Sequence, residues 1–227
     1  VSTYDVSAFA VLNDYETKSE IVTLQPNSLQ APFLVAIRED NIVENTEQFG
    51  VRVTSTDPQV NVVNGNLQVS ITDNDKITLT MDSNTYQVGE DDGFVSVRVV
   101  VTGQTAVDIA GSRLSTNSLT AQSPSDYGTI AQTILVTPSS STPLTFTITI
   151  QNDATIESNE FFQAVLSTTN TDQVNIGTPS SSSITILDDD ALFISFEQPN
   201  YIVSEDDGTI TVGVTVTGST ALTLEFG

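Results

Sequence analysis

Acidic residues gather at a few places in this 227-residue chain, and their spacing points to metal binding. Ser183–Asp190 reads SITILDDD, an alternating segment that ends in three consecutive aspartates. Two ionised carboxylates about 5 Å apart repel each other by roughly 3 kcal/mol at an effective dielectric constant near 20. Such a cluster needs a compensating charge. The chemistry that this segment predicts is the binding of a hard cation by carboxylate oxygens.

The overall composition excludes several other classes of function. The chain has 29 acidic and 6 basic residues, which gives a net charge of −23 and opposes binding to nucleic-acid backbones and anionic lipid surfaces. It has no Cys and no His, which excludes disulfides, thiol catalysis and typical zinc sites. No apolar run approaches the roughly 20 residues that a membrane-spanning helix needs. We therefore expect no nucleic-acid partner, no membrane insertion and an oxygen-only metal site.

Among hard cations, Ca²⁺ suits such a site best. It accepts six to eight oxygen ligands at about 2.3–2.6 Å in flexible geometry, whereas Mg²⁺ takes fewer protein carboxylates and keeps several waters. The alternative is that the acidic residues only form turns and a solvated surface. Turn formation explains one aspartate per loop but not three in a row. The sequence therefore predicts Ca²⁺ as the cofactor.

An internal repeat organises the chain. Thr85–Gly103 (TYQVGEDDGFVSVRVVVTG) recurs 115 positions later as Asn200–Gly218 (NYIVSEDDGTITVGVTVTG). In the same way Ile71–Asp75 (ITDND) corresponds to Ile186–Asp190 (ILDDD), also 115 positions apart. Self-similarity at a fixed period is the signature of repeated structural modules. The spacing predicts tandem modules of about 113–115 residues.

The module boundaries cut the chain into one complete and two partial units. Residues 76–190 form a complete module, residues 1–75 the later part of another, and residues 191–227 the first strands of a third. Either this is an excerpt of a long array, or the last part of one copy completes the first part of the next in a head-to-tail filament. Partial sandwiches expose apolar faces and unpaired strand edges, so we expect higher-order assembly.

Alternating and apolar segments in the complete module predict strands without any helical periodicity. About seven short strands in one module indicate an all-β fold, an immunoglobulin-like Greek-key β-sandwich. Because consecutive strands alternate in direction, we expect the acidic loops to meet at one pole of the sandwich. The expected strands are Ile77–Met81, Phe94–Thr102, Ala106–Leu114, Thr129–Val136, Thr145–Ile150, Phe161–Ser167 and Ser183–Leu187.

Four motifs in this order resemble the Calx-beta domain family. They are Tyr86–Gly93, Ser125–Tyr127, Asn152–Phe162 and Gly177–Asp190, and with their repeats they cover nearly the whole chain. The family includes regulatory calcium-binding domains of sodium–calcium exchangers and tandem arrays in extracellular adhesion proteins. The resemblance implies a β-sandwich that binds Ca²⁺ at one pole.

The resemblance also implies which residues hold the ions. In the complete module they are Glu90, Asp126, Asp153, Glu157, Glu160, Asp188, Asp189 and Asp190. In the split module the corresponding residues are Asp14, Glu39, Asp40, Glu44, Glu47, Asp73 and Asp75, with Glu205 at the far end of the chain as the counterpart of Glu90. Asn152 and Asn74 stand where the pattern has acidic residues. In a head-to-tail filament, the second of these sites is completed between subunits.

Three functions compete on these observations. The leading one is a structural or adhesive repeat of a cell-surface or extracellular protein, in which Ca²⁺ stiffens the module junctions and the partners are neighbouring modules, other copies, or surface and matrix ligands. The second is an intracellular Ca²⁺ sensor, which a submicromolar dissociation constant would favour. The third is a glycosidase with two carboxylates about 5–10 Å apart. No acid pair is marked as proton donor and partner, so we expect no enzyme.

Overall fold

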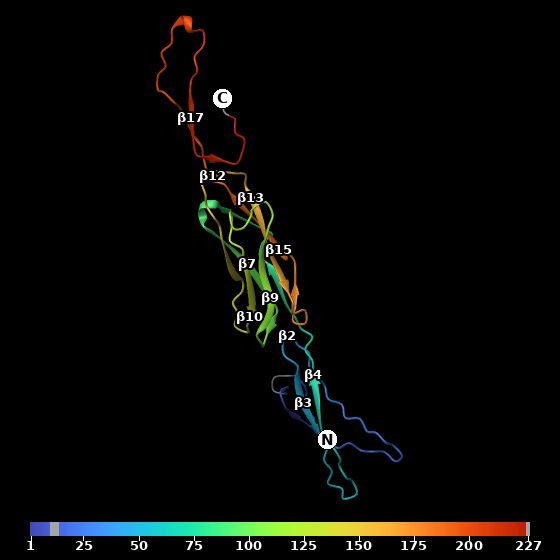
Figure 1. The fold of residues 1–227 in the computed structure, drawn as a ribbon. Helices are drawn as coiled ribbons and strands as arrows, with labels where there is room; N and C mark the ends of the chain where they lie inside the picture. Colours follow the sequence, from blue (N-terminus) through green and yellow to red (C-terminus); the bar gives the residue numbers. More distant parts are fainter. Residues whose placement is uncertain (10–13, 226–227) are drawn as a thin grey trace.

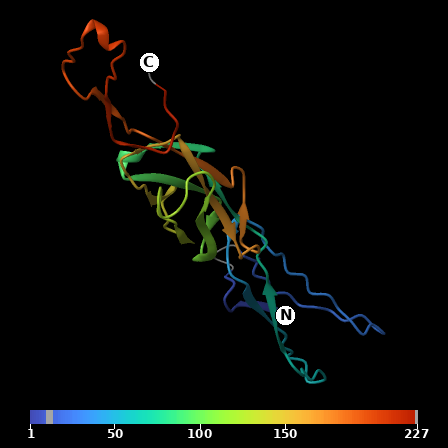
Figure 2. The ribbon, with the colours of Figure 1, turned by 45° about the horizontal axis from the view of Figure 1, so that its top comes forward.

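The structure, a computed structural model, describes residues 1–9 and 14–225. Three parts follow one another along an elongated molecule, with the two chain ends toward its opposite tips (Figures 1 and 2). Within the described residues, the helical elements are two short 3₁₀ turns, η2 (Glu90–Asp92) and η3 (Glu205–Asp207). No helix in this part of the chain is long and apolar enough to cross a membrane. The prediction of an all-β fold is confirmed.

The middle part is a sandwich of two sheets. One sheet contains, in spatial order, β10 (Ala131–Val136), β9 (Ile109–Ser118), β13 (Glu160–Thr168), β15 (Ser181–Leu187) and β6 (Thr85–Gly89). The other contains β11 (Leu144–Thr149), β7 (Phe94–Thr102), β5 (Ile77–Met81) and β14 (Val174–Ile176). Neighbouring strands are antiparallel except at two edges, where β6 runs parallel to β15 and β14 runs parallel to β5.

The core of the sandwich follows from the alternation in the sequence. Val95, Val97 and Val99 of β7 are buried, while Phe94 and Arg98 of the same strand are exposed. Successive side chains of a strand point to opposite faces, so one set fills the space between the sheets. Burying each such side chain contributes about 1.5–3 kcal/mol. This core fixes the strand ends, and with them the loops at both poles.

Five of the seven strand predictions differ from the structure in their bounds, three of them, β11, β13 and β15, by only one or two residues. The predicted strand Ala106–Leu114 is wrong at its start, because the chain turns after β8 (Gln104–Thr105) and β9 begins only at Ile109. The Thr105 hydroxyl and the Val107 backbone bond to each other and make this turn. The predicted strand Thr129–Val136 begins at Ala131 instead. With the unpredicted edge strands β6 and β14, the two sheets contain nine strands rather than about seven.

The strand pairings confirm the tandem repeat. In the first part, β1 (Ser2–Asp5), β3 (Glu47–Arg52) and β4 (Asn66–Ile71) form one sheet. The pairing of Glu47 with Ile71 there repeats the pairing of Glu160 with Ile186 in the sandwich. In the last part, β16 (Phe193–Phe196) pairs with β17 (Val214–Thr217) in the register that β5 and β7 use 115 residues earlier.

Short parallel pairings connect the three parts. β2 (Ile42–Val43) of the first part pairs with β8 of the middle part. β12 (Thr155–Ile156) of the middle part pairs with β18 (Ser219–Thr220) of the last part. Both joints therefore use a loop near the acidic pole of one repeat and a turn near the start of the next.

Candidate metal centre

The core strands position the acidic side chains by simple alternation. Glu160 lies two residues before the fully buried Phe162 on β13, and Asp188 lies two residues after the buried Ile186 on β15. Residues two apart on a strand share a face, so both carboxylates continue the inner faces of the sandwich at its pole. Glu90 follows buried Val88 by the same spacing and is only 8% exposed.

Asp126 is held in place by its neighbour Tyr127. Tyr127 is fully buried and stacks on Phe162, with ring centroids 3.9 Å apart and an interplanar angle of 6°. One oxygen of Asp126 accepts a hydrogen bond from the Gln122 backbone N–H at 2.6 Å. Burial opposes ionisation of Asp126, but this bond and one with Ser125 outweigh it and lower the pKa of the carboxyl group. Asp126 is therefore a fixed, ionised ligand candidate.

The loops at this pole bring the carboxylates of the middle part into one pocket. In two groups, ligand oxygens lie within 4.8 Å of one another: Glu90 with Asp153 and Asp190, and Asp126 with Glu157 and Glu160. The pocket is lined by Glu90, Ser125, Asp126, Gln151, Asp153, Glu157, Ser158, Glu160, Ile186 and Asp188. Loops from four regions of the sequence thus meet at one pole, as their positions between antiparallel strands suggested.

Backbone hydrogen bonds hold these loops against the carboxylates. The Asp153 N–H donates to Glu90 Oε1 at 2.7 Å, and the Glu157 N–H donates to Asp188 Oδ1 at 3.0 Å. Each bond engages one oxygen of a carboxylate, and the other oxygen of the group keeps its lone pairs. The loops are therefore shaped around an oxygen-lined centre.

The electrostatics of the pocket call for a cation. Burial, followed by the charges of neighbouring acids, raises the pKa of Glu157 and Asp190. Burial and a hydrogen bond shared with Asp126 raise the pKa of Glu160 to about 7. Asp190 Oδ2 is buried without a hydrogen-bond partner, and no Lys or Arg of the described residues lines the pocket. A divalent cation would neutralise these charges, and the oxygen-only donor set fits Ca²⁺.

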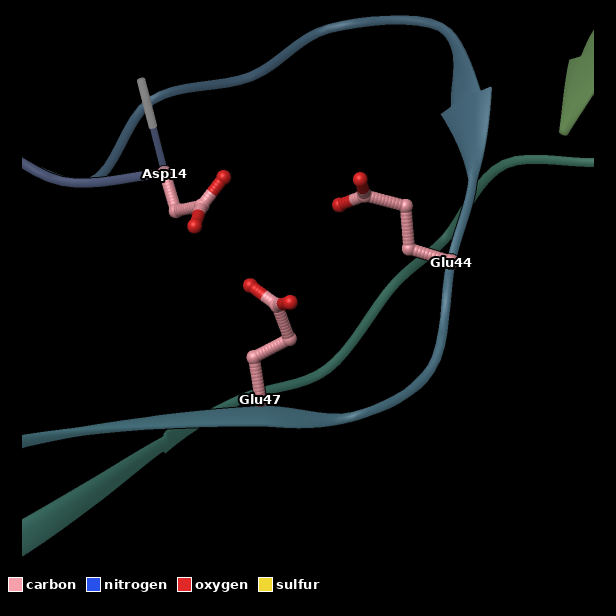
Figure 3. A group of neighbouring side chains, drawn as sticks. All are labelled: Asp14, Glu44 and Glu47. Atoms are coloured by element: carbon pink, nitrogen blue, oxygen red, sulfur yellow. The ribbon is translucent and has the colours of Figure 1, made fainter. Parts of the chain in front are cut away.

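The first part carries the same arrangement around Asp14, Glu44 and Glu47. Their ligand oxygens lie within 4.8 Å of one another, and Figure 3 shows Asp14 from one segment and Glu44 and Glu47 from another pointing toward a common centre. Tyr15 is buried and stacks on Phe49 at 4.4 Å, repeating the aromatic pair that holds Asp126. Burial and a hydrogen bond with Asp14 raise the pKa of Glu47 to about 7. The pocket is also lined by Glu39, Asp40, Asp73 and Asp75.

Two predicted ligands lie apart from these clusters. Asp189 is exposed and belongs to neither group of converging oxygens in the described chain. Glu205 is exposed in η3, in the part of the chain that Figure 1 draws at the end opposite to the first part. Among the described residues, Asp40 and Asp75 form no group equivalent to Glu90, Asp153 and Asp190. The first part therefore carries one of the two groups of the middle part.

Several residues of the pole were missed in the sequence. Ser125 and Gln151 line the pocket, and Asn159 Oδ1 accepts a hydrogen bond from the Asp188 N–H at 3.3 Å. Val43 and Ile156, which take part in the joints, were also missed. A signal for the last two exists: each is an apolar residue directly before a predicted ligand, Glu44 or Glu157, in a loop rich in acidic and amide residues.

A family model matches the chain, and two solved structures are similar to it. The sequence model of the Calx-beta domain matches residues 1–75, 72–190 and 188–225. The chain is similar to the crystal structure of the apo-form Calx CBD1 domain, with 26% identity over 51% of this chain and 100% of that chain and a TM-score of 0.47. It is also similar to CBD12 from CALX1.2, with 24% identity over 56% of this chain and 52% of that chain and a TM-score of 0.46.

No curated protein matches the chain. The family comprises calcium-binding domains, and the acidic clusters of this chain supply oxygen ligands alone, so the prediction of Ca²⁺ as the cofactor is confirmed. The three matched segments together run from residue 1 to residue 225. The chain belongs to the Calx-beta domain family.

Proposed function

We propose that this protein is a calcium-binding structural repeat of a cell-surface or extracellular protein, in which Ca²⁺ fixes each module against the next. One observation carries the proposal. The loop that carries Asp153 and Glu157 to the acidic pocket also contains β12, which pairs with the following part of the chain. The loop that carries Asp40 and Glu44 contains β2 and does the same at the other joint.

The ion acts through charge neutralisation at this pole. Glu90, Asp153 and Asp190 would hold one Ca²⁺, and Asp126, Glu157 and Glu160 a second, with Asp188 lining the same pocket. Without the ions, like charges push the pocket loops apart, and the loops also carry the joint strands. With the ions bound, the same carboxylates attract a common centre and the loops keep one position. Millimolar extracellular Ca²⁺ would be sufficient at affinities of about 10⁻⁴–10⁻³ M.

Small-angle X-ray scattering of the full chain, with Ca²⁺ and with chelator, tests the proposal. We expect Ca²⁺ to give a longer and narrower distribution of interatomic distances, because the modules become aligned. Mg²⁺ at the same concentration serves as the control for general ionic screening. Identical scattering curves with Ca²⁺ and with chelator, in a chain shown by calorimetry to bind Ca²⁺, would contradict a role in joint stiffening.

The partial modules further support head-to-tail assembly. Phe196 and Val203 of the last part are 71% and 50% exposed, whereas their counterparts 115 residues earlier, Met81 and Val88, are buried in the sandwich core. In the same sandwich core lies Phe162, whose counterpart in the first part is Phe49. The first and last parts therefore carry complementary halves of one module, and a second copy of the chain can supply the missing half.

Assembly of this kind would also complete a metal site. In the middle part Glu90 approaches Asp153 from the turn after β6. In the first part Asp40 is the counterpart of Asp153, and the counterpart of Glu90 is Glu205, which a second copy would provide. We expect Ca²⁺-dependent growth in light scattering that Glu205→Gln reduces at least tenfold and that Glu197→Gln, an exposed acidic position outside the clusters, leaves unchanged. A monodisperse monomer at micromolar concentration with Ca²⁺ would contradict assembly.

The alternative function is an intracellular Ca²⁺ sensor, as in sodium–calcium exchangers. The high number of carboxylates at one pole favours it, because affinity for Ca²⁺ rises with ligand charge. Isothermal titration calorimetry separates the two functions. A dissociation constant above about 10⁻⁴ M fits the extracellular scaffold, and one below about 10⁻⁶ M fits the sensor.

We also propose that the role is not enzymatic. Carboxylates in both pockets converge on common centres, and Glu90 and Asp73 accept hydrogen bonds from backbone N–H groups of neighbouring loops. Polysaccharide hydrolysis by the chain that disappears in Glu160→Gln would contradict this assignment.

A further inference from the structure

Val43 is a loop residue of the first part that is buried in the middle part. It is 1% exposed and belongs to the same buried cluster as Ile77 and Val136 of the sandwich. The buried residues of its own part, Ala8, Tyr15 and Phe49, form a separate cluster. Val43 therefore packs in the core of the next module and not in that of its own, and we call a residue in this position a plug.

Residues at the end of the sandwich that faces the first part, which we call its base, form hydrogen bonds to Val43 and to the residue after it. We call the residues that form these bonds the socket. The Val43 carbonyl accepts hydrogen bonds from the Ala106 N–H at 3.0 Å and from Thr105 Oγ1 at 3.2 Å. Gln173 Nε2 donates to the Glu44 carbonyl at 3.4 Å. Gly103, with φ +101°, turns the chain into the socket at a conformation that side-chain-bearing residues rarely adopt.

The second joint repeats hydrogen bonds of this arrangement, with Ile156 half-buried where Val43 is buried. The Ile156 carbonyl accepts hydrogen bonds from the Ala221 N–H at 3.0 Å and from Thr220 Oγ1 at 3.4 Å. The socket sequences are Gly-Gln-Thr-Ala-Val at 103–107 and Gly-Ser-Thr-Ala-Leu at 218–222. The bonds that Ala106 and Thr105 donate to Val43 thus recur where Ala221 and Thr220 donate to Ile156, so this part of the contact is a property of the repeat.

Carboxylates of the acidic pocket hold the plug on both sides. The Ile42 N–H donates to Asp40 Oδ1 at 2.8 Å, and the Glu44 N–H donates to Asp73 Oδ2 at 3.2 Å. At the second joint the Thr155 N–H donates to Asp153 Oδ1 at 2.6 Å, and the Glu157 N–H donates to Asp188. Any movement of these carboxylates is therefore transmitted to the residue between them.

We propose that Val43 and Ile156 are the plugs through which ion occupancy at one module controls the docking of the next. The inference rests on the proposed function and specifies its contact. The partner surface is the base of a following Calx-beta module with the pattern Gly-x-Thr-Ala-apolar. The plugs are positioning residues, because they would contact no ion. When the pocket loop keeps one position, the plug that it carries holds the next module in one orientation.

Distance measurements by pulsed electron paramagnetic resonance test this inference in the full chain. The chain has no Cys, so Gln68→Cys on β4 and Gln132→Cys on β10 place one spin label on each side of the first joint. We expect Ca²⁺ to narrow the distance distribution at least twofold. Val43→Ala should abolish the narrowing while Ca²⁺ affinity, measured by calorimetry, changes less than threefold. Val63→Ala, at a position that is 80% exposed, is the matched control and should behave as the unmodified chain.

The outcomes separate this inference from the proposed function. Narrowing in Val43→Ala equal to that of the unmodified chain overturns the plug and leaves the calcium joint intact. Binding of Ca²⁺ without narrowing in the unmodified chain overturns both. If Val43→Ala changes the circular dichroism spectrum, Thr105→Val provides the second test, because it removes the hydroxyl bonds to Val43 and Val107 and keeps the apolar side chain of Val43 and the backbone bond from Ala106. The same loss of narrowing is expected there, and its absence overturns the inference.

Discussion

Replacing Glu90 by Gln should affect the chain in opposite directions with and without Ca²⁺. Glu90 is nearly buried and has its ligand oxygen within 4.8 Å of that of Asp153. At that separation two ionised carboxylates repel by about 3 kcal/mol at an effective dielectric constant near 20. Asp153 is exposed, so solvent screening reduces the gain from neutralising Glu90 to about 1 kcal/mol. The amide oxygen of Gln can still accept the hydrogen bond from the Asp153 N–H.

In chelator, Glu90→Gln should therefore raise the midpoint of thermal unfolding by about 3–4 °C for a module of this size. In Ca²⁺ it should weaken binding at least tenfold, which corresponds to a loss of about 1.4 kcal/mol, because a charged ligand of one group is lost. Circular dichroism melting and calorimetry measure the two effects. Asp108→Asn, an exposed change of the same charge away from the pocket, is the control. A lower midpoint in chelator together with unchanged Ca²⁺ affinity would refute this account of Glu90.

Two further predictions concern the aromatic pair and the effect of pH. Phe162→Ala should lower the free energy of unfolding by about 3–5 kcal/mol, because it leaves a cavity beside Tyr127. It should also weaken Ca²⁺ binding, because Tyr127 then no longer holds Asp126 in place. Chemical denaturation and calorimetry measure the two effects, and an unchanged Ca²⁺ affinity would contradict the role of the aromatic pair in positioning Asp126. Burial, and then hydrogen bonds shared with Asp14 and Asp126, raise the pKa of Glu47 and Glu160 to about 7, so Ca²⁺ binding should release protons at pH 6 and few at pH 8.5. Without Ca²⁺, these two groups stabilise the folded state most below pH 4.5, because folding raises their pKa. This contribution to the free energy of unfolding should disappear as the pH rises through 7, which melting curves in chelator at several pH values can check.

Local patterns were sufficient to predict the repeat and much of the sandwich. β7 has the predicted bounds, because its alternation of Val with polar residues is long and regular. The convergence of the acidic loops also follows from strand alternation alone. The start of β9 was missed although the preceding turn has local bonds between Thr105 and Val107, because Ala106 within it also bonds to Val43, which lies 63 positions earlier in the chain. β6 and β14 are short parallel edge strands whose partners are distant in sequence.

In the site, as in the fold, only the features that depend on residues close in sequence could be predicted. Period-two alternation could have separated Asp189 from Asp188 and Asp190, because neighbouring residues at the end of a strand point to opposite sides. The two groups of converging oxygens depend instead on loop conformations that backbone bonds to Glu90 and Asp188 fix. The burial of Val43 in a neighbouring repeat is a tertiary contact, which the sequence indicates only through an apolar residue before Glu44 that recurs as Ile156 before Glu157.

The most direct test of the account is the thermal unfolding of the full chain in Ca²⁺ and in chelator. A ligand that binds only the folded state stabilises it by RT ln(1 + [L]/Kd), which is about 2.7 kcal/mol at a concentration of 100 times Kd. We expect the midpoint to rise with Ca²⁺ concentration and to rise much less with Mg²⁺. A midpoint that stays the same from chelator to millimolar Ca²⁺ would contradict calcium binding at these poles.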